Sequence, residues 1–186
     1  MNALWKQLAI ATNWPVLVAV LVLSSLGVLS IHADAPLDGQ KQAGFLVVAI
    51  ACMALFQAID YRAIGRFSWA FYILSLLLLI YTVVPWTHAP KGDQRPLRVP
   101  LTNGAFAWIN FVFLRFQPAE LMKIAFVMVL ARYLRFRSNY RTLTGLLAPF
   151  GLAMVPLALI LKQPDLGTAL IFIPALFAML FVAGAK

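Results

Sequence analysis

Long apolar runs constrain the fold of this chain more than any other feature of its sequence. The hydrocarbon core of a bilayer is about 30 Å thick, so a helix needs about 20 mostly apolar residues to cross it. Of the 186 residues, 63% are hydrophobic and 11% are charged, whereas soluble domains carry about 25% charged residues. We therefore predict an all-α fold, a polytopic transmembrane helix bundle that forms a single membrane domain over residues 1–186. Its six expected spans lie near residues 14–32, 43–60, 67–85, 118–134, 145–161 and 165–184.

The longest loop, near residues 85–117, divides into two halves of different composition. Prolines and charged residues mix over 85–100, which is typical of an extended, solvated segment. Residues 103–116 are rich in aromatic side chains but too few to cross a bilayer. We expect a short interfacial helix around 104–116, with its rings at headgroup depth. This helix would either anchor the loop on the membrane or form a ledge beside a lipid-binding groove.

The net charge of +9 could indicate a nucleic-acid partner, but the basic residues are spread over short loops between the apolar windows. Membrane topology and anionic headgroups explain that distribution better, so we expect membrane lipids and no nucleic acid as partners. One compact basic cluster favours the cytoplasmic side for its loop. The N-terminus is then cytoplasmic, and the loop near 85–117 faces outward. The cluster comprises Arg132, Arg135, Arg137 and Arg141.

Two short stretches repeat the same chemistry where apolar windows begin. Residues 116–123 read Phe-Gln-Pro-Ala-Glu-Leu-Met-Lys, and residues 162–170 read Lys-Gln-Pro-Asp-Leu-Gly-Thr-Ala-Leu. Each places an acid shortly after Gln-Pro and a lysine within three residues of that acid. Ionisable groups at a membrane helix entrance are costly unless they have a function, so the two stretches predict one polar site in the bundle. The candidate substrate-binding or cavity residues are Gln117, Glu120, Lys123, Gln163 and Asp165.

A purely structural interpretation of these stretches stays open. Proline is favoured in the first helical turn, and an acid there meets the positive end of the helix dipole. Two observations favour a site: the motif occurs twice on the same predicted side, and Lys123 lies one turn into an apolar run. Glu120 and Lys123 share one helix face at their spacing of three residues. They can therefore pair with each other or line a cavity together with Asp165.

Other familiar reaction chemistries have no signature in this sequence. It contains no Gly-rich phosphate loop, no zinc-ligand cluster and no Ser-His-Asp constellation, and His32 and His88 are isolated loop residues. The single cysteine, Cys52, lies inside an apolar run and is expected to be a small buried apolar side chain. We therefore name no metal ligand and no certain cofactor, although a divalent cation stays possible.

Several blocks of the sequence resemble one known family. Residues 103–109 read Asn-Gly-Ala-Phe-Ala-Trp-Ile, and they are followed by the Gln-Pro stretch from Phe116 and by Arg-Tyr-Leu at 132–134. This pattern is similar to the SEDS family of cell-wall polymerases, which includes RodA, FtsW and SpoVE. The block at 163–170 resembles the RodA version more than the FtsW version, which usually reads Glu-Pro-Asp-Phe-Gly. The resemblance covers essentially the whole chain.

The resemblance implies a ten-span protein of the bacterial inner membrane. Such a peptidoglycan glycosyltransferase polymerises lipid II into glycan strands during cell-wall elongation, beside a class B penicillin-binding protein that crosslinks the product. Glu120, Lys123 and Asp165 match charged groups of the family's outward-facing central cavity, and Lys123 is the leading cation for a diphosphate. The family's proposed catalytic Asp lies between its seventh and eighth spans, beyond Lys186. The sequence is thus expected to be an N-terminal half without the catalytic carboxylate.

One departure and two rival functions accompany this interpretation. Family members usually carry an Arg immediately before the tryptophan of the Asn-Gly-Ala block, where this chain has Ala107. A flippase or transporter of a lipid-linked precursor also places charged pairs and bent helices within the membrane, although the flanks of the two Gln-Pro stretches differ too much for an internal repeat. A non-catalytic membrane scaffold of the elongation or division complex is the other alternative.

Overall fold

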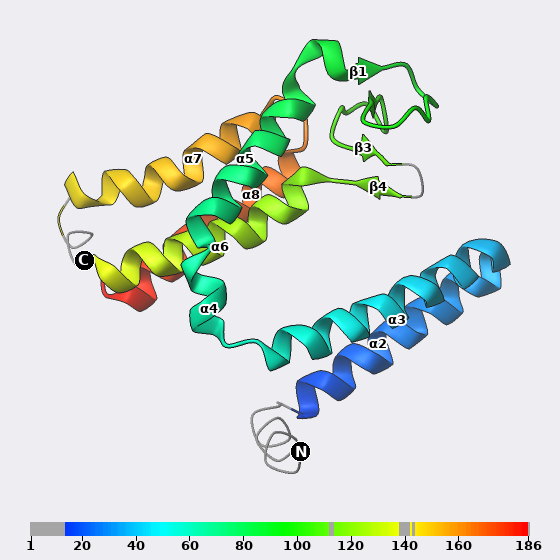
Figure 1. The fold of residues 1–186 in the computed structure, drawn as a ribbon, viewed down its shortest axis with the longest axis horizontal. Coiled ribbons are helices and arrows are strands. Elements are labelled where there is room, and N and C mark those ends of the chain that lie inside the picture. Colours follow the sequence, from blue (N-terminus) through cyan, green and yellow to red (C-terminus); the bar gives the residue numbers. More distant parts are fainter. Residues whose placement is uncertain (1–13, 112–113, 138–141, 143, 186) are drawn as a thin grey trace. The chain divides into compact units, whose positions relative to one another are not determined.

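The computed structural model describes residues 14–111, 114–137, 142 and 144–185, and most of them are helical (Figure 1). The all-α prediction is confirmed, since a helix occupies each of the six apolar windows. The chain divides into two compact units, Met1–Ala63 and Ile64–Lys186; a single membrane domain over the whole chain stays a prediction. The helices are α2 (Trp14–Asp34), α3 (Pro36–Ala58), α4 (Tyr61–Arg66), α5 (Ser68–Val83), α6 (Pro118–Phe136), α7 (Leu147–Leu161) and α8 (Leu166–Ala183).

Four of these segments are long and apolar enough to cross a membrane: Trp14–Asp34, Pro36–Gln57, Thr144–Leu161 and Leu166–Ala183. The helices in the other two apolar windows, α5 and α6, do not meet this criterion, for separate reasons. α5 is apolar but has only 16 residues, about 24 Å at 1.5 Å per residue. α6 has 19 residues but carries ionisable side chains in its first and last turns. We therefore expect the stability of α5 and α6 in a membrane to depend on packing against the other helices of their unit.

The first unit is a helical hairpin of α2 and α3. Its turn is closed at Ala35, whose N–H donates to the Ile31 carbonyl over 2.8 Å, and Pro36 begins α3, where its missing N–H costs nothing. A Cβ added to Gly39 would lie 2.5 Å from the His32 Cα. Because only a glycine permits this approach, Gly39 sets how closely the two helices pack at the turn.

The second unit packs α5, α7 and α8 around α6. The buried residues of α6 recur at helical spacing and include Met122, Phe126 and Val129. Phe126 meets Phe172 of α8 with ring centroids 5.2 Å apart. The Tyr72 hydroxyl on α5 donates to the Leu152 carbonyl of α7 over 2.9 Å. α6 therefore forms the centre of this unit.

The prediction of an interfacial helix around 104–116 is wrong. That segment contains a tight turn and short strands, with residues 112–113 outside the part of the chain that the structure describes. Thr102 and Ala105 exchange two backbone hydrogen bonds of 2.9 and 3.0 Å across Asn103 (φ 50°) and Gly104 (φ 82°). Asn-Gly favours such a turn because both residues tolerate positive φ, whereas a helix requires negative φ.

Short strands organise the rest of the loop, which is less extended and less solvated than expected. A 3-10 turn, η1 (Pro85–Thr87), follows α5, and the paired segments bury Val99 and Ile109 almost completely. The first pair is parallel and the second antiparallel. The strands are β1 (His88–Ala89) with β2 (Val99–Pro100) and β3 (Ile109–Asn110) with β4 (Arg115–Phe116).

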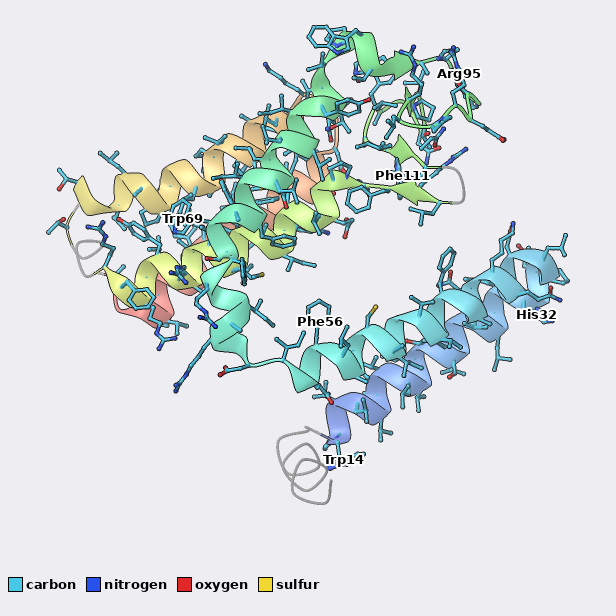
Figure 2. All side chains as sticks on the ribbon, viewed as in Figure 1. Trp14, His32, Phe56, Trp69, Arg95 and Phe111 are labelled. Carbon is cyan, nitrogen blue, oxygen red and sulfur yellow. The ribbon has the colours of Figure 1, made fainter. Side chains whose placement is uncertain are left out.

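A charged pair and a buried amide close the loop. Arg95 Nη2 lies 2.6 Å from Asp93 Oδ2, and the Asp93 side chain is only 8% exposed. Asn110 Nδ2 donates to the Asp93 carbonyl over 2.5 Å. The hydrogen bonds and charge of the Arg95 guanidinium lower the pKa of the Asp93 carboxyl to about 2. Figure 2 labels Arg95 and Phe111 on this loop.

We predict that Gly104→Ala loosens the loop. The added Cβ meets open space, so the cost comes from the left-handed backbone alone, about 1–2 kcal/mol. A change of that size shifts an equilibrium about 5–30-fold, and proteolysis follows the population of the open form. Trypsin should cleave the loop faster by about that factor. Gly151→Ala is the matched control, because Gly151 lies in α7 with equally open space. Equal cleavage rates for both variants would contradict the prediction.

We also predict that acid removes the contribution of Asp93 to loop order. A carboxyl with a lowered pKa stabilises the fold above its unfolded value of about 3.9. This contribution is lost as the pH falls from about 4 towards 2. Hydrogen exchange in peptides over 88–100 should therefore differ strongly between the parent and Asp93→Asn at pH 5. The difference should shrink clearly by pH 2.5 and disappear only below pH 2. A difference that is independent of pH would rule out this role.

Candidate functional site

The candidate residues gather at one end of the second unit. The chain leaves α5 and enters α6 at the end that carries the loop, and the α7–α8 turn lies at the same end (Figure 1). Consecutive helices alternate in direction, so the end of α5 meets the beginnings of α6 and α8. Both Gln-Pro stretches therefore lie at this end, as their repeated chemistry predicts.

Asp165 and Gln117 join the beginnings of two helices. Asp165 is the N-cap of α8, and its Oδ1 accepts a hydrogen bond from the Thr168 backbone N–H over 3.0 Å. Its Oδ2 accepts from Nε2 of Gln117, the N-cap of α6, over 3.3 Å. The carboxylate thus caps α8 and also contacts α6. Both contacts are structural, and the expectation that Asp165 also binds substrate stays a prediction.

Glu120 and Lys123 form an ion pair on α6, as their spacing predicts. Lys123 Nζ lies 2.8 Å from Glu120 Oε1, with side-chain exposures of 25% for the lysine and 57% for the glutamate. Within the described part of the chain, Lys123 forms its ion pair with Glu120 and none with Asp165. The two charged groups therefore share an end of the bundle without direct contact. The side chain of Lys123 is therefore more covered than that of Glu120.

Gln163 does not point towards Asp165. Its side chain is 2% exposed, and Nε2 donates to the hydroxyl oxygen of Thr82 near the end of α5. The Thr82 hydroxyl in turn donates to the Leu79 carbonyl over 2.7 Å. The amide oxygen Oε1 of Gln163 is buried and has no hydrogen-bond partner among the residues that the structure describes. Gln163 is therefore a buried link to α5, and the expectation that it faces substrate stays a prediction.

Thr82 and His88 are the two residues here that the sequence analysis did not single out for a role. His88 Nε2 lies 3.0 Å from the Thr82 carbonyl. Its ring stacks on Phe106 at a centroid distance of 3.8 Å and an interplanar angle of 3°. His88 thus ties the Asn-Gly-Ala segment of the loop to α5. The only hint in the sequence was a threonine at the end of an apolar window, which is a weak signal.

Two further observations bear on the chemistry of this end. Ala107, at the position where the resembled family usually has Arg, is 3% exposed, so this part of the loop is apolar. In the described ranges, no three His, Cys, Asp or Glu side chains gather closely enough to hold a metal ion. What the described residues offer is one partly covered ammonium, two carboxylates and the positive ends of α6 and α8. Such a set suits the recognition of an anionic group at a membrane surface.

Comparison with known proteins identifies the family of this chain. The family described as cell cycle protein, covering FtsW, RodA and SpoVE, matches residues 3–186. The peptidoglycan glycosyltransferase RodA of Treponema pallidum is 29% identical over 180 residues, covering 92% of this chain and 39% of the relative. A probable peptidoglycan glycosyltransferase FtsW of Escherichia coli O6:H1 is 44% identical over 168 residues, and this match covers 80% of this chain and 40% of the relative.

Two solved structures are similar in fold. The crystal structure of Thermus thermophilus RodA matches with a TM-score of 0.77 and 28% identity, covering 95% of this chain and 55% of that one. A chain from a peptidoglycan synthase complex that coordinates polymerisation and crosslinking matches with a TM-score of 0.79 and 28% identity. This match covers 94% of this chain and 48% of that one. The chain thus spans about 40% of these two relatives and about half of these structures. The resemblance expected from the sequence is confirmed: this membrane protein belongs to the FtsW/RodA/SpoVE family of cell cycle proteins.

Proposed function

We propose that this chain supplies part of the substrate site of a peptidoglycan glycosyltransferase that polymerises lipid II into glycan strands. The observation that carries the proposal is the family match over residues 3–186, which includes the polar end of the second unit. The relatives quoted above are named peptidoglycan glycosyltransferases. The RodA-like form of the block at 163–170 favours a role in cell-wall elongation.

The chemistry of the reaction assigns a role to each group. Glycosyl transfer from a lipid diphosphate breaks the bond between the sugar carbon and a phosphate oxygen, and negative charge grows on the departing diphosphate. A cation held nearby stabilises that charge more in the transition state than in the bound substrate. In this proposal Lys123 is that cation, and the positive ends of α6 and α8 add to its field. Asp165 and Gln117 orient polar groups of the substrate.

The covering of Lys123 supports its role. Its side chain is 25% exposed, less than half the exposure of its partner Glu120. A charge held beside protein, where the effective dielectric constant is lower than in water, interacts more strongly with an anion than a charge surrounded by water. Glu120 neutralises the lysine in the absence of substrate, and a diphosphate would compete with that carboxylate. The ion pair therefore keeps the Lys123 ammonium paired until an anionic substrate replaces Glu120 as its partner.

We further propose that the protein lies in the bacterial inner membrane with its N-terminus in the cytoplasm. A class B penicillin-binding protein would then be its partner. One structure similar to this chain belongs to a peptidoglycan synthase complex that coordinates polymerisation with crosslinking. The arginines near the end of α6 support the orientation through their positive charge. On this orientation the loop and the polar end of the second unit face outward, where glycan strands are assembled.

We predict that Asp165→Asn and Lys123→Met, in the full-length protein, each lower lipid II polymerisation at least tenfold. Asparagine caps a helix about as well as aspartate does, so Asp165→Asn should keep α8 capped while removing the charge. Lys41→Met is the matched control for Lys123→Met, because Lys41 also pairs with an acid at i−3, over 2.9 Å, but is 71% exposed. It should retain the parental rate. Membrane yield and thermal stability, measured on each variant, separate a lost site from a lost fold.

The same assay distinguishes the rival functions. A polymerase consumes lipid II and forms glycan strands, a flippase only moves lipid II between leaflets, and a scaffold does neither. Asp165→Asn polymerising at the parental rate would reduce Asp165 to a helix cap. A full-length parent that reorients lipid II without forming product would overturn the proposed activity.

We predict that cysteines at residues 94 and 137 are labelled from opposite sides of the membrane. Gln94 lies exposed in the loop and Arg137 exposed at the end of α6, and α6 spans about 28 Å at 1.5 Å per residue. Gln94→Cys and Arg137→Cys would each be made in a Cys52→Ala background, since Cys52 is exposed. An impermeant maleimide applied to spheroplasts should label only the first. Labelling of both, or of the second alone, would refute the orientation.

A further inference from the structure

A buried hydrogen bond connects α5 to the turn that carries Asp165. Gln163 is 2% exposed and Thr82 is fully buried, and the amide of the first donates to the hydroxyl of the second. We infer that Thr82 and Gln163 are positioning residues, which hold the carboxylate of Asp165 where the substrate needs it. The catalytic part of this inference rests on the proposed polymerase function.

The turn between α7 and α8 has few other attachments. The Gln163 backbone N–H donates to the Ile160 carbonyl over 2.9 Å, and the Asp165 N–H reaches the same carbonyl at 3.4 Å. Both bonds join the turn to the end of α7 only. The Gln163 side chain adds an attachment to α5, and the Asp165 side chain adds one to Gln117 on α6. Asp165 is therefore placed by three helices together, and the attachment to α5 is the buried one.

The direction of the hydrogen bond follows from the groups around it. The hydroxyl hydrogen of Thr82 is donated to the Leu79 carbonyl at 2.7 Å, so its oxygen is left as an acceptor for the Gln163 amide. The backbone carbonyl of Thr82 lies 3.0 Å from Nε2 of His88, and this nitrogen must carry a hydrogen, because a carbonyl only accepts. Thr82 is thus held from the loop as well as from its own helix. A buried, well-connected polar link of this kind keeps a defined geometry.

The position of Gln163 makes this link matter for the site. Gln163 lies two residues before Asp165, so a shift of its side chain moves the turn and the carboxylate with it. A displacement of about 1 Å in a reacting arrangement can lower a rate about 100-fold. We expect Thr82→Val to lower kcat for lipid II polymerisation by about 10- to 100-fold.

Thr82→Ser keeps the hydroxyl and should retain at least half of the parental kcat.

Gln163→Leu gives a second, independent variant. It removes the donor together with the amide oxygen that has no partner within the described ranges. Gln163→Leu leaves the Thr82 hydroxyl donating to the Leu79 carbonyl. Thr82→Val instead leaves the buried amide of Gln163 without its acceptor, which costs more. Gln163→Leu should therefore lower kcat about as far as Thr82→Val does, with a smaller loss of thermal stability. Ser75→Ala is the matched control: Ser75 lies two turns earlier on α5 and is buried, and among the described residues its hydroxyl bonds only to the Phe71 carbonyl of its own helix.

A double-variant cycle with Asp165→Asn tests positioning directly. If Thr82 acts through Asp165, Thr82→Val should lower the residual kcat of the Asp165→Asn enzyme less than twofold. A purely structural role predicts the same fold-loss in both backgrounds. The inference is overturned if the losses multiply, if Thr82→Val retains the parental kcat, or if Ser75→Ala lowers kcat as much as Thr82→Val.

Thermal unfolding separates this inference from the proposed function. A full-length parent that forms no glycan product overturns the function, and the link is then tested by Tm alone. Asp165→Ala removes the cap on α8, so Thr82→Val should lower Tm less in that background than in the parent if the two residues act on one turn. Additive shifts in Tm would overturn the positioning role whatever the activity.

Discussion

Ionisable side chains near a bilayer need partners within the protein, and in the second unit this demand falls mainly on α6. The helix carries Glu120 and Lys123 in its first turns and Arg132 and Arg135 in its last. At one end Lys123 pairs with Glu120 over 2.8 Å, and at the other Arg132 Nη1 donates to the Gly65 carbonyl over 2.6 Å. Between these ends the buried face of α6 packs against α5, α7 and α8. A helix with polar ends and an apolar middle can therefore sit at the centre of the unit, with its charges near the membrane surfaces.

The two units differ in how their side chains suit a membrane environment. α2 has no buried residues and presents apolar side chains such as Leu23 and Leu29 all around, so lipid can cover it directly. Its contact with α3 depends on the close approach at Gly39. The second unit instead buries hydroxyl and amide groups and bonds several of them internally: the Tyr72 hydroxyl donates to the Leu152 carbonyl, and the Gln163 amide donates to the Thr82 hydroxyl. Polar groups that are fixed in this way can support a site.

The candidate site is built from helix ends, with the loop as its neighbour. Asp165 and Gln117 each cap a helix, and Lys123 lies one turn into α6. Helices hold such groups more rigidly than loops do, and precise placement is what transition-state stabilisation requires. The loop contributes through His88 and Phe106, which stack beside the end of α5. Its own shape depends on the Asn-Gly turn and on the Asp93–Arg95 pair.

The sequence by itself determined the helices, the family and the end of the bundle where the polar residues gather. Apolar windows of membrane length leave few alternatives to helices, because backbone groups in hydrocarbon must bond within their own segment. The pairing of Glu120 with Lys123 was also predictable, since their spacing places them on one helix face. The loop was mispredicted over 104–116 because its aromatic content was given more weight than the positive φ that Asn103 and Gly104 favour.

Only the tertiary structure decided which polar groups meet. Gln117 and Gln163 occupy equivalent places in the two repeated stretches, yet one contacts Asp165 and the other is buried against Thr82. Thr82 and Gln163 are 81 residues apart in the chain, and no local pattern specifies a contact between them. The packing of α5 beside α6 and α7 brings Thr82 to the turn that carries Gln163. Local sequence sets what each helix end contains, and the packing of whole helices sets what each end touches.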